Sequence, residues 1–311
     1  MSFEVPINKR VRVILNTDAK NEADDQYAIV HTLLTPKFII KGLIGAHFGN
    51  HFSDDTMLQS YEECKHVVDL MHMSDAVNVY KGAKKCIADD GTYEYSEGAK
   101  LIVKEALSDD PSRLFVAFLG PITDLACAYL KHPEIVGKLT AIWIGGGMYP
   151  EGHKEFNLSN DINAANIVFQ SGIDLWQVPM NVYAKMMVSL TELEMKVKPC
   201  GEIGKYLFCQ MAEFNTAQAG RSEWPNGESW SLGDSPVVGL MMDPMICCYD
   251  MREAPLIDKN MKKSDLKEMA GISSASLAKL GKGDNITTDV LLRICEVMDC
   301  RIEDILETVR D

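Results

Sequence analysis

Short apolar runs and longer amphipathic segments alternate along the first two thirds of the chain. Strand-like apolar runs lie near residues 11–15, 38–48, 77–82, 113–120, 139–147 and 174–180. Between them, apolar residues recur with the period of a helix near residues 24–35, 54–71, 97–107, 123–132 and 163–171. Regular alternation of strand and helix is typical of a mostly parallel sheet with helices on both faces. The sequence therefore predicts an α/β fold with its chemistry in the loops at the strand ends.

The pattern changes near residue 255. Residues 259–311 form short helical segments without a strand-like run, and they hold 9 Lys and Arg against 10 Asp and Glu. Residues 1–258 hold the other 22 basic and 35 acidic residues. We predict an α/β domain over residues 1–255 and a small all-α domain over residues 256–311.

Composition narrows the class of protein. With 311 residues, 46% of them hydrophobic, the chain can bury a large core. No run approaches the roughly 20 apolar residues that cross a bilayer, and the start lacks the apolar segment of a signal peptide. We therefore expect a cytoplasmic protein with no membrane partner. Nine cysteines form no CxxC pair and mostly lie in apolar stretches, which favours buried, reduced thiols. A formal net charge of −14 disfavours nonspecific attraction to nucleic acid.

The segment VRVILNTDAKNEADDQYA concentrates acidic residues between a predicted strand and a predicted helix. It holds Asp18, Glu22, Asp24 and Asp25. If the strand stops at Leu15 and the helix begins at Asp24 or Asp25, these carboxylates gather at the carboxyl edge of the sheet, where open α/β folds bind ligands. Such a cluster favours a hard divalent cation, Ca²⁺ before Mg²⁺. The alternative is simple capping of a turn and a helix, which needs only one or two acids.

Three further segments place polar residues at the ends of other predicted elements. LGPITDLA places Thr123 after a strand, EFN places Glu155 and Asn157 after a glycine run, and LGDSP places Asp234 before an apolar helix. Together with the acidic loop, these segments resemble the inosine-uridine-preferring nucleoside hydrolase family over roughly residues 11–250. Haloacid-dehalogenase phosphatases also begin with a strand and an acidic loop, but they need a nucleophilic Asp where this chain has Asn16.

The resemblance implies Ca²⁺-dependent hydrolysis of the N-glycosidic bond of a ribonucleoside, giving ribose and free base, as in purine and pyrimidine salvage. By that analogy the metal ligands are Asp18, Asp25, the Thr123 backbone carbonyl and Asp234, and Asp18 is also the general base. The ribose-binding residues implied by the family are Asp24, Asn50, Glu155 and Asn157. The family also implies a homo-oligomer. A metal-bound water and a positioned carboxylate suit the oxocarbenium-like transition state of glycoside cleavage.

The chain departs from the family pattern in two places that matter for catalysis. Asn16 replaces the first acid of the DxDxxxDD loop, and two additional residues separate Asp18 from Asp24. Gly233 replaces the histidine that helps protonate the leaving base. The candidates to replace it are His47, His51, His153 and Tyr183, each of which also has a plain structural interpretation. Trp224 and Trp230 either stack on a nucleobase or pack their loop against the body.

The C-terminal segment resembles the Cro/C1-type helix-turn-helix family. A short helix precedes the turn at residues 270–273, a second helix begins at Ser274, and two further helices follow. By analogy Ser274, Ser276 and Lys279 lie at the start of a recognition helix, with Ala275 beside them. The expected phosphate contacts are Lys262, Lys263 and Lys282, and the expected core is Leu266, Met269, Ile272, Leu277, Leu280, Leu291, Leu292, Ile294, Val297, Ile302 and Ile305. Most of the family's first helix is absent.

Three functions follow as hypotheses. The first is a Ca²⁺-dependent nucleoside hydrolase. The second is a nucleoside-responsive transcription regulator that binds DNA through the C-terminal domain, and the third is a catalytically impaired riboside-binding protein. The near-neutral charge of residues 259–311 weighs against the second, because operator binders neutralise several phosphates.

Overall fold

The structure is a computed structural model that describes residues 4–49, 53–150, 152, 154–220, 227–257, 266–267, 269–280, 285–298 and 302. The chain divides into two compact units, Met1–Leu256 and Ile257–Asp311. Within the described residues, no helix is long and apolar enough to cross a membrane.

A six-stranded, wholly parallel sheet forms the centre of the first unit, in the order β3-β2-β1-β4-β5-β6. The strands are β1 (Val11–Thr17), β2 (Phe38–Gly45), β3 (Val79–Lys81), β4 (Leu114–Phe118), β5 (Thr140–Ile144) and β6 (Asp174–Val178). Strand order reverses between β1 and β4, so the loops that follow these two strands diverge to opposite faces. That switch point is where open α/β sheets bind ligands.

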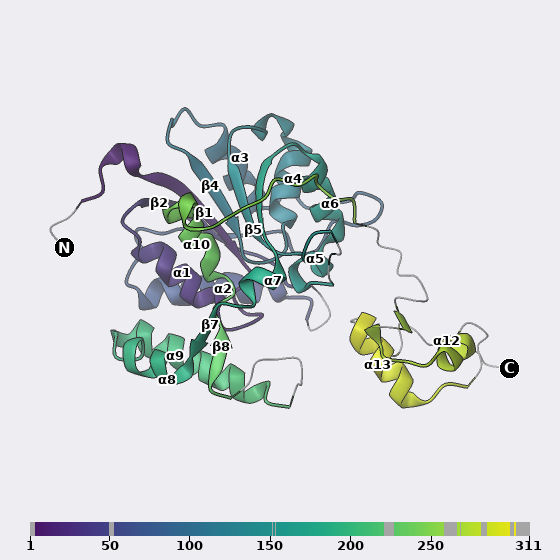
Figure 1. Cartoon of the computed structure of the whole chain (residues 1–311). Helices are drawn as coiled ribbons and strands as arrows, with labels where there is room; N and C mark the ends of the chain where they lie inside the picture. The colour runs from purple at the N-terminus through teal and green to yellow at the C-terminus, as the bar shows by residue number, and fades with distance from the viewer. Residues whose placement is uncertain are drawn as a thin grey trace. The chain divides into compact units, whose positions relative to one another are not determined.

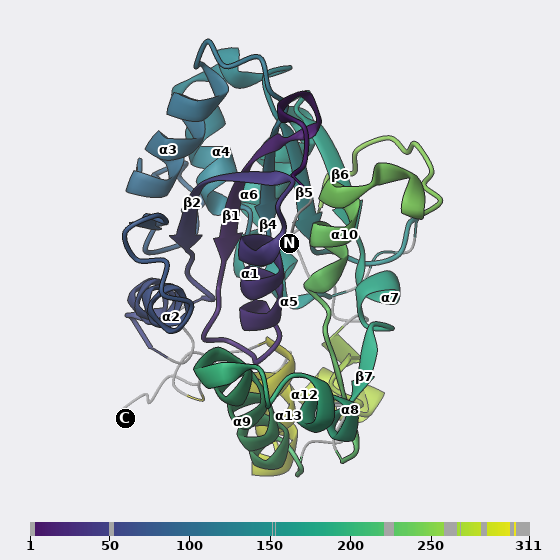
Figure 2. The same cartoon turned by 90° about the vertical axis from the view of Figure 1, so that its left-hand side faces the viewer.

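Helices cover both faces of this sheet, which confirms the predicted α/β fold. The helices α1 (Asp25–Leu34), α2 (Thr56–Leu70) and α10 (Ser235–Met242) pack along one face, and α3 (Glu97–Ala106), α4 (Thr123–Lys131) and α6 (Ile162–Gln170) along the other, as Figures 1 and 2 show. The short α5 (Phe156–Asn160) precedes α6, and single 3-10 turns lie at Ile7–Lys9, Pro133–Ile135 and Pro244–Ile246. Because helices cover both faces, every residue of β4 and β5 is buried.

A small lobe between β6 and α10 was not assigned by the sequence pattern. It contains α7 (Met180–Tyr183), α8 (Leu190–Lys196), α9 (Gly201–Ala217) and an antiparallel pair, β7 (Met187–Ser189) with β8 (Ser229–Ser231). Trp230 is 1% exposed, and its ring meets Phe214 edge to face at 5.5 Å between ring centroids. Trp230 therefore packs in the core of this lobe and offers no free face to a nucleobase. Trp224 lies outside the described residues.

Two expectations about the first unit were wrong in detail. Strand β1 does not stop at Leu15, because Asn16 pairs with Phe118 of β4 and Thr17 pairs with Gly45 of β2. The expectation of buried thiols also fails for several cysteines. Cys64, Cys127 and Cys295 are buried, whereas Cys86, Cys200, Cys247 and Cys248 are exposed, and all are free thiols.

The second unit shows the predicted second helix, α12 (Ser274–Leu280), followed by α13 (Thr288–Met298). The Ser273 hydroxyl accepts a hydrogen bond from the Ser276 backbone N–H at 3.0 Å, which caps α12. The described core contains Leu266, Ala270, Ile272 and Ile294, with Leu277, Leu280, Val290 and Val297 against it. Two predicted core residues, Met269 and Leu292, are instead exposed, because each lies on the outer side of its helical segment.

Candidate active site at the carboxyl edge of the sheet

Four buried carboxylates meet where β1 and the first turns of α1 and α10 come together. Asp18 directly follows β1, and Asp25 is the first residue of α1. Asp24 and Asp234 occupy the N-cap positions of α1 and α10, and neither side chain makes a capping hydrogen bond there. One oxygen each from Asp24, Asp25 and Asp234 lie within 4.8 Å of one another. The helix N-termini offer partial positive charge, and the Asp234 N–H donates to Asp24 Oδ2 at 3.2 Å. The fold thus brings together acids that are more than 200 residues apart.

The electrostatics of this cluster show a deficit of positive charge. Burial is the main cause that raises the pKa of all four carboxyls: the pKa of Asp24 to about 6, that of Asp25 to about 7, and those of Asp18 and Asp234 well above the ordinary value. The neighbouring acids raise the pKa values of Asp18, Asp25 and Asp234 further. Among the described residues, Asp18 Oδ2 is buried without a hydrogen-bond partner. A cation would satisfy both the charge and this oxygen.

The position of Asp18 depends on a close approach by the loop after β4. A Cβ at Gly120 would lie 2.7 Å from Asp18 Cγ, so only glycine leaves room for this carboxylate. The Gly120 carbonyl accepts from Trp143 Nε1 at 3.0 Å, and the Leu119 N–H donates to the Asn16 carbonyl at 2.8 Å. Backbone pairing and this buried indole therefore hold the loop against Asp18.

Thr123 begins α4 and is held by a chain of buried hydrogen bonds. Its hydroxyl donates to Asp161 Oδ2 at 2.7 Å and lies 2.9 Å from His47 Nε2. Since the Gly49 N–H points at His47 Nδ1 from 3.2 Å, the ring proton belongs on Nε2, which donates to Thr123. Burial lowers the pKa of His47 to about 4, so the ring is neutral near pH 7. His47 therefore supports Thr123 and is poorly suited to protonate a leaving base.

Glu155 and Asn157 are buried beside the cluster and are engaged with the protein itself. The Glu155 carboxylate caps α5 and accepts from the N–H groups of Gly146 at 2.7 Å, Leu158 at 2.9 Å and Asn157 at 3.1 Å. Burial raises the pKa of Glu155 despite these donors. The Asn157 amide donates to backbone carbonyls of the β4 and β5 ends at 2.6 and 3.0 Å. Their contact with ribose stays a prediction.

Tyr183 lies next to the position of the missing histidine. A Cβ at Gly233 would come within 3.1 Å of Tyr183 Cδ2 and 3.2 Å of Asp24 Oδ2, so a larger side chain there would crowd both. The Tyr183 hydroxyl donates to Glu155 Oε1 at 2.8 Å, and burial raises the pKa of this phenol. The tyrosine therefore fills the space beside Gly233, and its hydroxyl proton is engaged in the hydrogen bond to Glu155.

The longer acidic loop is held by residues that the sequence did not single out. The Asn21 N–H donates to the Asp18 carbonyl at 2.8 Å and closes a turn. The Gln26 amide donates to Glu63 Oε1 of α2 at 3.0 Å, and Lys20 pairs with the same carboxylate at 3.1 Å. From α9, Gln210 Nε2 donates to the Ala23 carbonyl at 2.7 Å. A sequence signal existed only for Glu63, as a charged residue on the apolar side of an amphipathic helix.

Asp124 and Asp161 are further buried acids that sequence analysis missed. Each lies in the first turn or cap of a helix, a position that is usually explained by capping alone. Three residues proposed for the site or as replacement acids lie outside the described residues: Asn50, His51 and His153.

Comparison with known proteins finds ribonucleoside hydrolases among those that are similar to this chain. The pyrimidine-specific ribonucleoside hydrolase RihA of Salmonella arizonae is 26% identical over 250 residues, covering 72% of this chain and 76% of that protein. The non-specific ribonucleoside hydrolase RihC of Salmonella enteritidis is 25% identical, covering 63% of this chain and 69% of its own. The purine-preferring ribonucleoside hydrolase from Gardnerella vaginalis has a similar fold, with a TM-score of 0.62, 22% identity, and coverage of 76% of this chain and 81% of that one.

Two family models match the chain, and their ranges overlap over residues 255–280. A Cro/C1-type helix-turn-helix DNA-binding domain matches residues 255–311. The model of the inosine-uridine preferring nucleoside hydrolases matches residues 13–280, which is most of the chain. With its parallel sheet and the cluster of buried acids at the switch point, the chain belongs to the inosine-uridine preferring nucleoside hydrolase family.

Proposed function

We propose that this protein hydrolyses the N-glycosidic bond of ribonucleosides and that Ca²⁺ occupies the carboxylate cluster. The observation that supports the proposal is a group of three buried carboxylates, Asp24, Asp25 and Asp234, with oxygens within 4.8 Å of one another. Asp18 is buried as well, and the charges of nearby acids, Asp25 among them, raise its pKa. A fold that only needed helix caps would not concentrate four buried carboxylates.

The donor set fits a hard divalent cation. The carboxylates of the group offer oxygen ligands, and Asp18 Oδ2 is buried without a hydrogen-bond partner among the described residues. We assign Asp18, Asp25, Asp234 and the Thr123 carbonyl as ligands. Ca²⁺ suits this set better than Mg²⁺, because it accepts six to eight oxygens in flexible geometry. Asp24 shares the cluster and has one oxygen bound to the Asp234 N–H, so its role as a ribose ligand remains part of the proposal.

When bound, the ion would lower the pKa of a water and orient the ribose hydroxyls. We also assign Asp18 as the general base that accepts a proton from the attacking water. Its burial excludes bulk water, and the surrounding carboxylates favour the positive charge that develops on the ribose as the bond to the base breaks. Asn157 and Glu155, which the protein already holds in place, line the region assigned to the outer ribose hydroxyls.

Departure of the base has no assigned acid among the described residues. His47 is neutral and donates its ring proton to Thr123. The Tyr183 hydroxyl keeps its proton in a hydrogen bond that it donates to Glu155. We therefore expect turnover to depend strongly on how well the base leaves unaided. The panel of substrates should span purine and pyrimidine ribosides for this reason. A role in nucleoside salvage and a homo-oligomeric state belong to the same proposal, on the strength of the family.

The test is release of reducing sugar from that panel by the full chain, with Ca²⁺ and with a chelator. Asp18→Ala should abolish release and weaken Ca²⁺ binding, measured by calorimetry, while Asp109→Ala, an exposed acid away from the cluster, should match the wild type. Chelator-resistant release, or full activity of Asp18→Ala, would refute the mechanism. Riboside binding without release would identify an impaired enzyme that retains its binding site.

A second function is favoured by the helix-turn-helix match. We propose that the C-terminal unit binds DNA, with Ser274, Ser276 and Lys279 of α12 at the recognition surface. Lys262, Lys263 and Lys282, the proposed phosphate contacts, lie outside the described residues. A mobility shift with the full chain should weaken steeply with salt and with Lys279→Ala but not with Glu296→Ala on α13. Binding that is insensitive to Lys279→Ala would exclude this surface.

A further inference from the structure

Asn16 and Asp124 form a buried pair between the end of β1 and the start of α4, two segments that carry proposed ligands. Asn16 is the second-last residue of β1 and is inaccessible to solvent. Asp124 is the second residue of α4, and its side chain is 1% exposed. Asn16 Nδ2 donates to Asp124 Oδ2 at 2.8 Å. The other carboxylate oxygen, Oδ1, accepts from the Ala83 N–H at 2.9 Å and from the Ser96 hydroxyl at 2.5 Å. Asp124 is thus a carboxylate served by three donors.

The pair stands next to the proposed ligands along the chain. Asn16 precedes Asp18 by two residues, and Asp124 directly follows Thr123. We propose that Asn16 and Asp124 are positioning residues that hold Asp18 and the Thr123 carbonyl at the separation that a cation needs. This inference rests on the proposed metal site. The hydrogen bond is buried and joins residues 108 positions apart, so it ties the end of β1 to the first turn of α4.

Complementary polarity is the essential property of this pair. Two ionised carboxylates at this distance would repel each other unless they shared a proton, whereas an amide and a carboxylate form a hydrogen bond without one. The Ala83 N–H and the Ser96 hydroxyl both donate to Oδ1 of Asp124. Its other oxygen, Oδ2, therefore needs a separate donor. That explains why this chain has an amide at position 16, where the family resemblance places an acid. There is no spare room for rearrangement, because a Cβ at Gly82 would lie 2.5 Å from Asp124 Oδ2.

A reciprocal exchange tests the pair: Asn16→Asp, Asp124→Asn and the double variant that carries both. The two single changes alter the charge near the site in opposite directions, whereas the double variant conserves it. Charge alone would make Ca²⁺ bind more tightly to Asn16→Asp and more weakly to Asp124→Asn. Positioning predicts that both single variants bind Ca²⁺ more weakly, by about 10 to 100-fold, and that the double variant recovers most of the loss.

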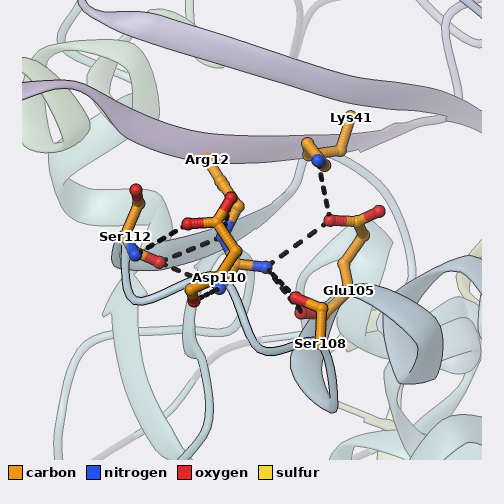
Figure 3. A network of polar contacts seen from close by, with 6 residues as sticks. All are labelled: Arg12, Lys41, Glu105, Ser108, Asp110 and Ser112. Carbon is orange, nitrogen blue, oxygen red and sulfur yellow. Dashed lines mark hydrogen bonds and ion pairs between the residues drawn. The ribbon is translucent and has the colours of Figure 1, made fainter. Parts of the chain in front are cut away.

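A matched control comes from the opposite end of β1, shown in Figure 3. There Arg12 Nη1 donates to the Ser108 hydroxyl at 2.8 Å and pairs with Glu105 at 3.5 Å, and Lys41 pairs with the same carboxylate at 3.1 Å. Glu105→Gln perturbs a buried polar network of the same strand far from the proposed ligands. It should lower the urea midpoint while leaving Ca²⁺ affinity unchanged.

The measurements are Ca²⁺ affinity by calorimetry, urea midpoint, and kcat and KM for a hydrolysed riboside, all on the full chain. Single variants with weaker Ca²⁺ binding and a restored double variant support the proposal. Opposite effects of the single variants that add in the double variant would overturn it in favour of charge alone, and so would unchanged affinity in both. A wild-type chain that binds no divalent cation would instead overturn the proposed function, and this inference with it.

Discussion

Replacing Asp25 with Asn should stabilise the metal-free protein. Asp25 is 3% exposed, and its carboxylate accepts a hydrogen bond from the Thr17 hydroxyl. Burial and the charge of Asp24 raise the pKa of Asp25 from 3.8 to about 7. An amide at this position keeps an oxygen for Thr17, removes the charge and supplies donors to the neighbouring carboxylates.

The magnitude follows from proton linkage. Because the folded chain binds this proton more tightly than the unfolded chain does, the free energy of unfolding falls as pH rises from about 4 to about 7 and stays low above that range. A shift of that size corresponds to about 4 kcal/mol at pH 8 as an upper value, since the four acids titrate together. Allowing for imperfect fit of the amide, we expect a gain of about 2 kcal/mol, or about 0.7 M in the urea midpoint.

The assay is urea unfolding at pH 5 and pH 8, with a chelator and with Ca²⁺, followed by tryptophan fluorescence. All four tryptophans lie in the first unit, so their emission reports that unit alone even if the C-terminal unit unfolds separately. With chelator, the advantage of Asp25→Asn should be present at pH 8 and nearly vanish at pH 5. At Ca²⁺ concentrations of 100 times its dissociation constant, the wild type should gain about 2.7 kcal/mol that the variant lacks. A variant less stable than the wild type in chelator at pH 8 would refute the reasoning.

Three other changes test separate parts of the site and chain. Gly120→Ala places a Cβ 2.7 Å from Asp18 Cγ, so kcat should fall by about 100-fold with little change in far-ultraviolet circular dichroism; unchanged kcat would show that the carboxylate has room to move. Gly233→His should lower activity rather than supply an acid, because the new side chain crowds Tyr183. Combining it with Tyr183→Ala should recover part of the lost activity. A gain in turnover from Gly233→His alone would contradict the packing argument. Removal of residues 257–311 should preserve hydrolysis and the tryptophan unfolding midpoint, and a lost transition would show that the two units depend on each other.

Much of the fold could be predicted from the sequence, because hydrophobic periodicity and polar loops are local patterns. The hydrophobic runs predicted all six strands of the sheet, and the polar loop predicted that α1 begins at Asp24 or Asp25. The small lobe was missed: β7 and β8 have only three residues each, and the longer helix α9 in the same lobe was not predicted either. Met269 and Leu292 were misplaced in the core of the C-terminal unit, because helical periodicity alone does not say which neighbouring elements cover a face.

The sequence by itself determined which residue types stand at the strand ends, and hence that acids, an amide and a threonine are available at one edge of the sheet. Only the tertiary structure decided which of them meet. It brought Asp234 to Asp24 and Asp25 from more than 200 residues away, placed Tyr183 against Gly233, and paired Asn16 with Asp124. Those contacts depend on strand order and on the packing of α10 against α1, which arise from burial summed over the whole sheet and not from any local pattern.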